Sequence, residues 1–214
     1  MTSRHLTQVE TRIVEALRNG APMRYADLRD LSRGSNRAIK TLVDDGLIER
    51  LPMGLYTYFD PDRSQDSSFE SFAALSVGRP DAVICFESAA AFHGLTVQNP
   101  SEIWAAFPYN TSPPRGGYGL ELKTARWNDR SMSVGVIDVD IVGITVRMTS
   151  PARTVIDLQR FAKSRGGEET AGEVLANYAD NHSMAEVLKL ARELGCEGSI
   201  RPRLEMAHSM GRRR

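Results

Sequence analysis

The residues of this sequence best suited to chemistry lie in one stretch, residues 35–44, which reads SNRAIKTLVD. Taken as a helix, the stretch places its polar side chains on one face: Asn36, Arg37, Lys40, Thr41 and Asp44. Arginine and asparagine form paired hydrogen bonds with base edges, whereas lysine and threonine more often hold phosphates. The face therefore predicts contact with a groove of duplex DNA, with the Asp44 carboxylate at its rim.

The preceding sequence predicts the elements that would position this face. Apolar residues recur at three- and four-residue spacings between Leu6 and Leu17, as in an amphipathic helix. Residues 25–31 indicate a short second helix, and Gly34 supplies the turn after it. Ser35 is the expected N-cap of the third helix, because its hydroxyl can accept a free backbone N–H of the first turn.

The sequence after the third helix predicts a β-hairpin. Residues 47–51 and 55–59 are rich in strand-forming side chains, with Pro52-Met53-Gly54 as the turn between them. Three helices closed by such a hairpin, or wing, define a winged helix-turn-helix, which we assign to residues 1–60.

This domain predicts double-stranded DNA as a partner, with the third helix in the major groove and the wing on the backbone or minor groove. The predicted DNA-binding residues are Arg33, Ser35, Asn36, Arg37, Lys40, Thr41, Arg50, Met53, Gly54 and Tyr56. A protein-docking role for the domain remains the alternative, because winged helices also serve that purpose.

Composition is that of a soluble globular protein, with 41% hydrophobic and 25% charged residues. The formal net charge is +0, but Arg33, Arg37 and Lys40 lie within one eight-residue stretch, and residues 212–214 are all arginine. No apolar run approaches the roughly 20 residues that span a bilayer, and the N-terminus lacks the apolar core of a signal peptide. We therefore expect a cytoplasmic protein that does not associate with membranes.

Residues 60–68, DPDRSQDSS, have the composition of a linker, so we assign a second domain to residues 69–214. Its predicted helices and strands alternate: helices over 69–77 and 87–93, strands over 103–107, 120–127 and 134–148, a helix over 151–162, and helices from 168 onward. The helix from Pro151 has the strongest start signal, since Ser150 is an N-cap followed by proline at the first helical position. The expected fold class is α+β, a winged helix followed by a mixed α/β domain ending in helices.

Other reactive side chains favour structural roles. Arg153 and Asp157 are one helical turn apart and predict an exposed or partly buried ion pair. His93 stands alone before Gly94 and is interpreted as a helix-end residue. The two cysteines, Cys85 and Cys196, are far apart and lack the spacing of a zinc site, so buried thiols are expected.

One pattern favours an enzyme, although weakly. Pro80-Asp81 followed by Glu121-Leu122-Lys123 matches the PD-(D/E)xK arrangement, in which carboxylates hold Mg²⁺ and a lysine positions the attacking water. Short motifs of this kind arise readily by chance. No P-loop, GxSxG or HExxH motif is present, so we expect no enzymatic activity, no cofactor and no metal.

The order of motifs along the chain resembles the AbiEi family, the antitoxins of a bacterial toxin–antitoxin and phage-defence system. The resemblance covers nearly the whole chain and rests on the wing phrase LPMGLY (51–56), the helix SAAAFHGL (88–95), the phrase TSPARTVIDL (149–158) and the leucine-type helices near the C-terminus. None of these phrases is an active-site motif. Asp44 and Asp45 at the end of the third helix depart from the expected pattern, because they make the DNA-reading surface less basic.

The resemblance implies a winged helix that binds inverted repeats in its own operon promoter and represses it. It also implies a C-terminal domain that neutralises a nucleotidyltransferase-like toxin, by direct binding or only functionally. Inverted repeats imply two copies on one DNA site, so the chain would be a monomer in solution or a dimer on DNA. A DNA-binding transcriptional regulator without a toxin partner is the main alternative.

Overall fold

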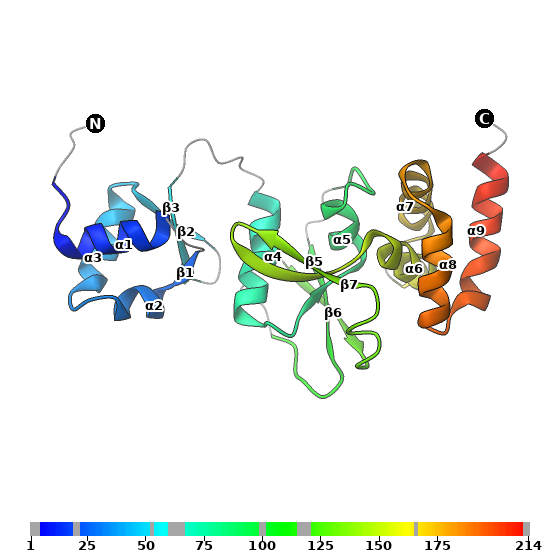
Figure 1. Cartoon of the computed structure of the whole chain (residues 1–214), viewed down its shortest axis with the longest axis horizontal. Helices are drawn as coiled ribbons and strands as arrows, with labels where there is room; N and C mark the ends of the chain where they lie inside the picture. The colour runs from blue at the N-terminus through cyan, green and yellow to red at the C-terminus, as the bar shows by residue number, and fades with distance from the viewer. Residues whose placement is uncertain are drawn as a thin grey trace. The chain divides into compact units, whose positions relative to one another are not determined.

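The computed structural model describes residues 5–18, 22–51, 54–59, 67–98, 102–114, 121–164 and 167–211 (Figure 1). Contacts within the chain divide it into two units. The N-terminal unit is Met1–Gly78 with Gly117–Gly119 and Asp140–Thr145, and the C-terminal unit is Arg79–Gly116 with Leu120–Val139 and Val146–Arg214. The described part of the chain contains no helix long and apolar enough to cross a membrane.

A capped amphipathic helix, α1 (Gln8–Arg18), begins the N-terminal unit. The Thr7 hydroxyl accepts the Glu10 N–H at 3.3 Å, and a Glu10 carboxylate oxygen accepts the Thr7 N–H at 2.8 Å. This reciprocal pair is a capping box, which satisfies two of the backbone donors that a helix start leaves free. Ile13 and Leu17 lie on the same face of α1 as the buried Glu10 and belong to the core of the unit.

The remaining elements of the helical part and wing follow in short succession: β1 (Met23–Arg24), α2 (Tyr25–Asp30), α3 (Ser35–Asp44), β2 (Ile48–Leu51) and β3 (Leu55–Tyr58). The three strands form an antiparallel sheet in the order β1-β3-β2. This is the element order of a winged helix-turn-helix. Strand β1 is an addition to the expected elements, since two residues are too few to carry a detectable pattern.

The core of this part is formed by one face of each helix and the inner face of the wing. Its buried members are Ile13, Leu17, Leu28, Ala38, Ile39, Leu42, Ile48 and Tyr56. The spacing Ala38, Ile39, Leu42 along α3 is the three- and four-residue pattern of a helix with one buried side. The opposite side of α3 is consequently left to solvent.

Helix α4 (Ser67–Gly78) groups with the N-terminal unit. Leu51 and Leu55 of the wing form a buried cluster with Ala74, and Val77 packs against it. The Arg24 guanidinium also donates to the Val77 carbonyl. The division between the units therefore follows α4, whereas the linker composition at residues 60–68 indicates a boundary before it.

The second sheet has five strands in the order β6-β5-β4-β8-β7 and belongs to the C-terminal unit, except for residues 140–145 of the β7–β8 hairpin, which group with the N-terminal unit. The strands are β4 (Val83–Ile84), β5 (Glu102–Pro108), β6 (Glu121–Trp127), β7 (Val136–Ile141) and β8 (Ile144–Thr149). Strand β5 runs parallel to β6 and antiparallel to β4, and β4 runs parallel to β8. The parallel pair places the C-terminal ends of β5 and β6 side by side, with Pro108 opposite Trp127.

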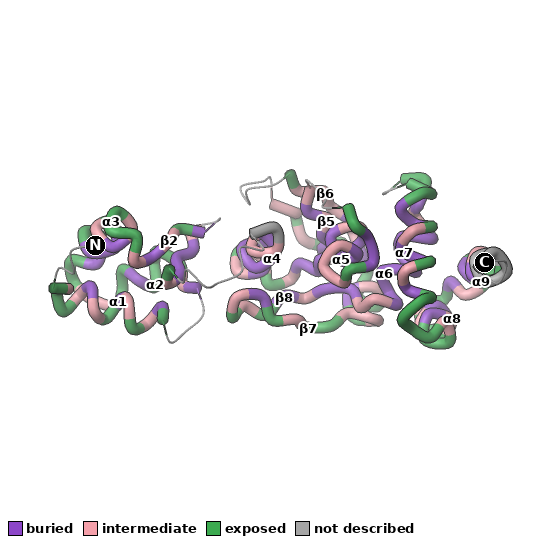
Figure 2. The backbone as a smooth tube through the Cα atoms, turned by 90° about the horizontal axis from the view of Figure 1, so that it is seen from above, coloured by how far each residue is buried: buried purple, intermediate pink, exposed green. Residues whose placement is uncertain are grey.

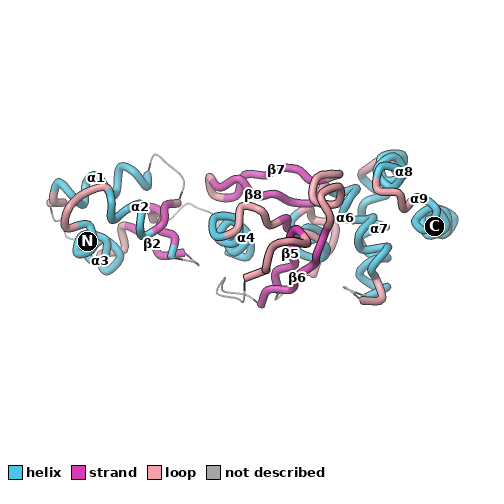
Figure 3. Tube along the Cα trace, turned by 90° about the horizontal axis from the view of Figure 1, so that it is seen from below, coloured by secondary structure: helices cyan, strands magenta, loops and turns pink. Residues whose placement is uncertain are grey.

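Five helices accompany this sheet: α5 (Phe86–Phe92), α6 (Pro151–Phe161), α7 (Gly167–Asn181), α8 (Met184–Glu193) and α9 (Glu197–Gly211). Helix α6 contacts α5, α7, α8 and α9, and Figure 3 shows α6 to α9 gathered at one end of the unit. Its residues 152–159 are all buried, which Figure 2 shows as a purple central segment. Helix α6 is therefore the central helix of the C-terminal unit.

Phe86 lies at the centre of an aromatic cluster in this core. Its ring makes edge contacts with Trp104, Trp127 and Phe161 at centroid distances of 5.5, 6.1 and 5.9 Å. Such edge-to-face pairs add to the stabilisation from burial alone. The cluster fixes the start of α5 against the sheet and the end of α6.

Most of the elements expected in the second half are present. The helix expected over 151–162 is α6, and Ser150 caps it by accepting the Arg153 N–H at 3.2 Å. The strand expected over 134–148 is two strands joined at Val142 and Gly143, whose positive φ values of 51° and 78° suit a two-residue hairpin turn. The two-residue strand β4 was not expected from the sequence.

Candidate nucleic-acid interface and the polar centre of the C-terminal unit

The solvent-facing side of α3 carries the residues expected to contact DNA. Asn36, Arg37 and Lys40 are exposed, as is Arg33 in the turn before the helix. Their backbone positions follow from the buried face of Ala38, Ile39 and Leu42, which turns the other side outward. The structure thus brings a basic and amide-bearing strip onto one exposed helix face.

The start of α3 differs from expectation in one detail. The N-cap is Gly34, in a left-handed conformation with φ 87°, and not Ser35. Ser35 is the first helical residue and is 1% exposed, and its hydroxyl donates to the Ser32 carbonyl at 2.6 Å. Glycine suits the tight turn because its left-handed φ costs it no Cβ clash. The buried Ser35 side chain has no surface with which to contact DNA.

A hollow of ≈ 310 Å³ lies beside this helix start and is lined by Arg29, Asp30, Ser32, Arg33, Gly34, Ser35 and Asn36. Two guanidinium groups and the positive end of the α3 dipole give its wall a cationic character. Asp30 opposes this in part, with its carboxylate 3.5 Å from Arg29 Nε. The hollow extends the strip of Arg33 and Asn36 toward α2.

Thr41 lies on the same helix but at the side of the strip. It is half-buried, and its hydroxyl donates to the Arg37 carbonyl at 3.0 Å. Such back-bonding occupies the hydroxyl proton within the helix. Thr41 is therefore poorly placed to donate to DNA, while its oxygen keeps acceptor capacity.

The residues of the wing that were predicted to contact DNA differ in their exposure to solvent. Arg50 is exposed on β2, and Gly54 is half-buried with φ 70°. Tyr56 is 7% exposed and belongs to the core, where its ring lies 6.1 Å from that of Tyr25. A base or phosphate contact by Tyr56 does not fit this position, because the neighbours on the core face cover the ring. Met53 lies outside the described residues.

Acidic side chains limit the positive charge of the face. Asp44 and Asp45 are exposed at the C-terminal end of α3, where the negative end of the helix dipole is also found. The potential along α3 therefore falls from the Arg33 end toward the Asp44 end. A polyanion would approach the N-terminal half of the helix more favourably.

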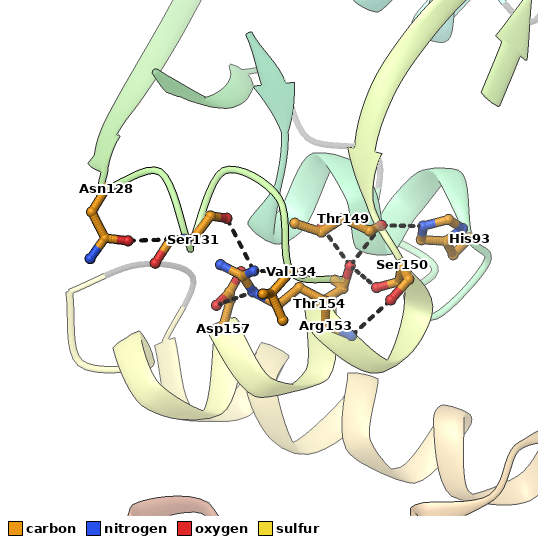
Figure 4. Close-up of polar contacts among 9 residues, drawn as sticks. All are labelled: His93, Asn128, Ser131, Val134, Thr149, Ser150, Arg153, Thr154 and Asp157. Atoms are coloured by element: carbon orange, nitrogen blue, oxygen red, sulfur yellow. Dashed lines mark hydrogen bonds and ion pairs between the residues drawn. The ribbon is translucent and has the colours of Figure 1, made fainter. Parts of the chain in front are cut away.

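A second group of polar side chains lies in the interior of the C-terminal unit (Figure 4). Arg153 Nε lies 3.0 and 2.9 Å from the two carboxylate oxygens of Asp157. The side chains of this pair are only 2% and 1% exposed. The expected ion pair is confirmed, but it is buried, whereas the spacing alone predicted an exposed or partly buried pair.

The Arg153 guanidinium has further partners in the loop that follows β6. It donates to the Ser131 carbonyl at 3.2 Å and also to the Val134 carbonyl. Its central carbon lies 4.5 Å from the centroid of the Trp127 ring, in a cation–π arrangement. A buried charge with this many partners holds the loop, β6 and α6 together.

His93 joins α5 to the end of β8 in the same region. Its Nε2 donates to the Thr149 carbonyl at 2.8 Å, and the Thr149 hydroxyl lies 2.8 Å from that of Thr154. Burial lowers the pKa of His93, against the opposing effect of this hydrogen bond. The neutral Nε2–H tautomer is the form that fits, so His93 is a structural residue at the helix end, as expected.

The geometry of the sheet rules out the PD-(D/E)xK arrangement. Strand β4 places Asp81 at the Pro108 end of the sheet, because Val83 pairs with Ala106, whereas Glu121 pairs with Glu102 at the opposite end. The separation along the strands is about 20 Å at about 3.3 Å per residue. The carboxylates therefore cannot share a metal ion.

The local partners of these groups agree with that conclusion. Asp81 is held by Arg79 through two contacts of 2.8 and 2.7 Å. Lys123 lies between Glu121 and Glu102 at 2.8 and 3.2 Å. Among the described residues no cluster of three or more His, Cys, Asp or Glu side chains has the geometry of a metal site. These residues form ion pairs at the two ends of the sheet.

Both cysteines are buried as free thiols, as expected. Burial raises the pKa of the Cys196 thiol, with smaller opposing contributions from Arg160 and Arg153. A protonated, buried thiol is a poor nucleophile. The cysteines therefore belong to the packing of the core.

The polar centre lies inside a segment that matches a known protein family. Residues 82–204, more than half of the chain, match the model of the AbiEi antitoxin C-terminal domain. The chain belongs to this family of antitoxin domains. The segment contains His93 and the Arg153–Asp157 pair, whereas α3 and the wing precede it.

A solved structure shares the fold over most of the chain. It is described as the crystal structure of RV2827C protein from Mycobacterium tuberculosis, with a TM-score of 0.60 and 16% sequence identity. The similarity covers 92% of this chain and 78% of that one. No curated protein matches the chain. At this identity the likeness speaks for the fold alone.

Proposed function

We propose that the protein is an antitoxin that represses its own operon and neutralises a nucleotidyltransferase-like toxin. The N-terminal winged helix would bind inverted repeats in the promoter through α3 and the wing, as a monomer that pairs on DNA or as a dimer. The observation that carries the proposal is the exposed strip of Asn36, Arg37 and Lys40 on a unit joined to an antitoxin domain.

The chemistry of the strip supports DNA as the ligand. Arg37 and Asn36 are types that pair with guanine and adenine edges, and Lys40 suits a phosphate. Arg33 and Arg29, which line the hollow at the start of α3, add positive charge, and Arg50 adds a further cation on the wing. Ser35 and Tyr56 are left out of the interface because both side chains are buried.

Neutralisation of the toxin is assigned to the C-terminal unit, which carries the family match. In this proposal the unit neutralises the toxin by direct binding or only functionally. In this view the two roles are separable. The strip on α3 serves the promoter, and the C-terminal unit serves the toxin.

A cell-based experiment separates these roles. The full chain is expressed with the nucleotidyltransferase-like protein encoded beside its gene, and growth is measured together with a reporter fused to the upstream DNA. Arg37→Ala/Lys40→Ala is expected to lose repression while keeping growth rescue. Lys163→Ala/Lys189→Ala, which removes the same charge from exposed positions of the C-terminal unit, is expected to keep both.

The outcomes test the two roles independently. Failure of the wild-type chain to rescue growth contradicts the antitoxin role with this toxin. Undiminished repression by Arg37→Ala/Lys40→Ala contradicts the assignment of DNA contacts to α3.

A further inference from the structure

The hollow at the start of α3 has two arginine side chains in its wall, and the folded chain leaves one of them unengaged. Arg33 is exposed, and its guanidinium group makes no hydrogen bond or ion pair with any residue that the structure describes. By contrast, Arg18 donates to the Tyr58 hydroxyl at 2.7 Å, and Arg24 donates to the Val77 carbonyl. The donors of Arg33 are therefore available to a ligand.

The second arginine of the wall, Arg29, is only partly engaged. Its Nε lies 3.5 Å from a carboxylate oxygen of Asp30, and the two side chains are 57% and 74% exposed. A guanidinium group carries five N–H donors, so this long contact leaves the others available. Two guanidinium groups and one carboxylate leave the wall with a surplus of one positive charge. That surplus matches the single negative charge of a phosphodiester group.

The turn between α2 and α3, which lines the hollow, is ordered by the chain itself. The Ser35 hydroxyl donates to the Ser32 carbonyl at 2.6 Å. The Gly34 carbonyl accepts the N–H groups of Arg37 and Ala38 at 3.2 and 3.3 Å. Binding of an anion requires no rearrangement of this backbone, so only the arginine side chains of the wall lose freedom.

The hollow is continuous with the strip on α3. Asn36 lines the hollow and also belongs to the strip, where Arg37 follows it. The first residues of a recognition helix are those that contact base edges in the major groove. The sugar-phosphate backbone borders that groove, so a group held beside Asn36 lies where a backbone phosphate passes. This position favours DNA over an unattached anion as the occupant.

We propose that the hollow holds one backbone phosphate of the promoter DNA through the guanidinium groups of Arg33 and Arg29. The inference rests on the DNA-binding role proposed above and assigns one contact of that role to a site. A guanidinium group can bind a phosphate through two parallel N–H···O bonds, which fix direction as well as distance. The contact sets the position of α3 on the duplex without reading sequence, and Asn36 and Arg37 read the bases.

The most direct test removes one phosphate charge at a time. The full chain is titrated, by fluorescence anisotropy, with promoter duplexes in which a single phosphate is replaced by a neutral methylphosphonate. For the wild type we expect one position in each half-site at which the replacement weakens binding by about tenfold. The same replacement should have little effect on Arg33→Ala, because the partner of that phosphate is already absent.

Sequence and salt dependence separate the phosphate contact from base reading. Arg33→Ala should weaken binding to promoter and unrelated duplexes by the same factor and lower the salt slope by about 0.9. Asn36→Ala should instead lose affinity for the promoter alone. Arg130→Ala, which removes an exposed arginine from the C-terminal unit, is the control and should match the wild type on both duplexes. Thermal unfolding of the three variants should be unchanged, since all three side chains are exposed.

Two results overturn the inference while promoter recognition stands. One is a salt slope in Arg33→Ala equal to that of the wild type, and the other is a methylphosphonate profile that Arg33→Ala leaves unaltered. Calorimetric titration with inorganic phosphate provides a third. Phosphate binding that is lost in Arg33→Ala, with DNA binding by that variant unchanged, makes a free anion the ligand and also overturns the inference.

Failure of the proposed function gives a different result. A wild-type chain with no preference for the promoter contradicts promoter reading, but the hollow acts on any duplex. The salt slope of Arg33→Ala on unrelated DNA then decides whether the hollow holds a phosphate: a slope lowered by about 0.9 supports the site, and an unchanged slope contradicts it.

Discussion

Arg153 and Asp157 form an ion pair inside the C-terminal unit, with Arg153 Nε 2.9 Å from the nearer carboxylate oxygen and both side chains almost fully buried. The pair lies one turn apart on α6, but its other contacts reach the Ser131 and Val134 carbonyls and the Trp127 ring. The central helix is therefore joined to β6 and its following loop by one guanidinium group.

Removing one partner of this pair should destabilise the protein strongly. Arg153→Met leaves the Asp157 carboxylate buried without its main counter-charge and is expected to cost about 3–5 kcal/mol of unfolding free energy. Urea unfolding of the full chain measures the loss. The double variant Arg153→Met/Asp157→Leu should lose less than the single one, because no charge is then stranded.

An exposed ion pair supplies the control for this experiment. Lys123→Ala removes the contacts to Glu121 and Glu102 at the edge of the sheet and should leave the urea midpoint nearly unchanged. An Arg153→Met variant as stable as Lys123→Ala would contradict the role given to the buried pair.

Replacing either of two glycines in the C-terminal unit by alanine should change the unfolding free energy, in opposite directions at the two positions. At Gly135, with φ 70°, a Cβ would lie 2.7 Å from Leu190 Cδ2 and 2.9 Å from Arg153 Cβ. Gly135→Ala is expected to destabilise by about 1–3 kcal/mol through strain and overpacking.

Gly172 lies within α7, where an added Cβ meets no atom within 4 Å. Gly172→Ala should stabilise by about 0.5–1 kcal/mol, because alanine loses less conformational freedom in a helix. Thermal and urea unfolding of the two variants show whether each substitution stabilises or destabilises the protein. Stabilisation by Gly135→Ala would mean that the loop after β6 is not packed against α6 and α8 as described.

The neutral form of His93 predicts a pH dependence. Burial lowers the pKa of His93 from its ordinary value of 6.5, so the unfolded chain takes up the proton at a higher pH than the folded chain. His93 therefore destabilises the fold progressively as the pH falls below 6.5 toward the lowered folded-state pKa, and its stabilising neutral form is fully present above 6.5.

His93→Gln removes this titration while keeping an N–H donor for the Thr149 carbonyl. The difference in unfolding free energy between wild type and variant should move in favour of the variant between pH 7.5 and 5.5. A difference that stays constant over this range would show that His93 does not titrate as described.

The carboxylate at the end of α3 should weaken DNA binding. Asp44→Asn removes a negative charge from the C-terminal end of the strip and is expected to tighten binding by about two- to fivefold at low salt. The gain should be similar for promoter and unrelated DNA, because the charge acts on phosphates. Fluorescence anisotropy with both duplexes, repeated with Glu15→Gln on α1 as the charge-matched control, makes the comparison.

The helices with a clear periodic pattern could be predicted from the sequence. The exposed and buried faces of α3 follow from the spacing of Ala38, Ile39 and Leu42, and the start of α6 follows from Ser150 with the adjacent proline. In these two helices the sequence pattern and the packing in the folded chain favour the same start and the same buried face. The two-residue strands β1 and β4 could not be predicted, since their existence depends on partners elsewhere in the sheet.

Side-chain burial at the candidate sites was the less predictable part. Ser35 and Tyr56 have residue types common in DNA interfaces, but the turn at Gly34 and the inner face of the wing direct both into the core. The burial of the Arg153–Asp157 pair depends on a loop some twenty residues earlier in the chain.

We propose that the protein reads its own promoter through the exposed face of α3. Titration of the upstream DNA with the purified full chain, over a series of salt concentrations, tests it most directly. We expect sequence-specific binding that weakens with salt, and a salt slope reduced by up to about 1.8 in Arg37→Ala/Lys40→Ala, with the slope of Lys163→Ala/Lys189→Ala unchanged. Equal affinity and slope in the two double variants, or no preference for the promoter over unrelated DNA, would contradict it.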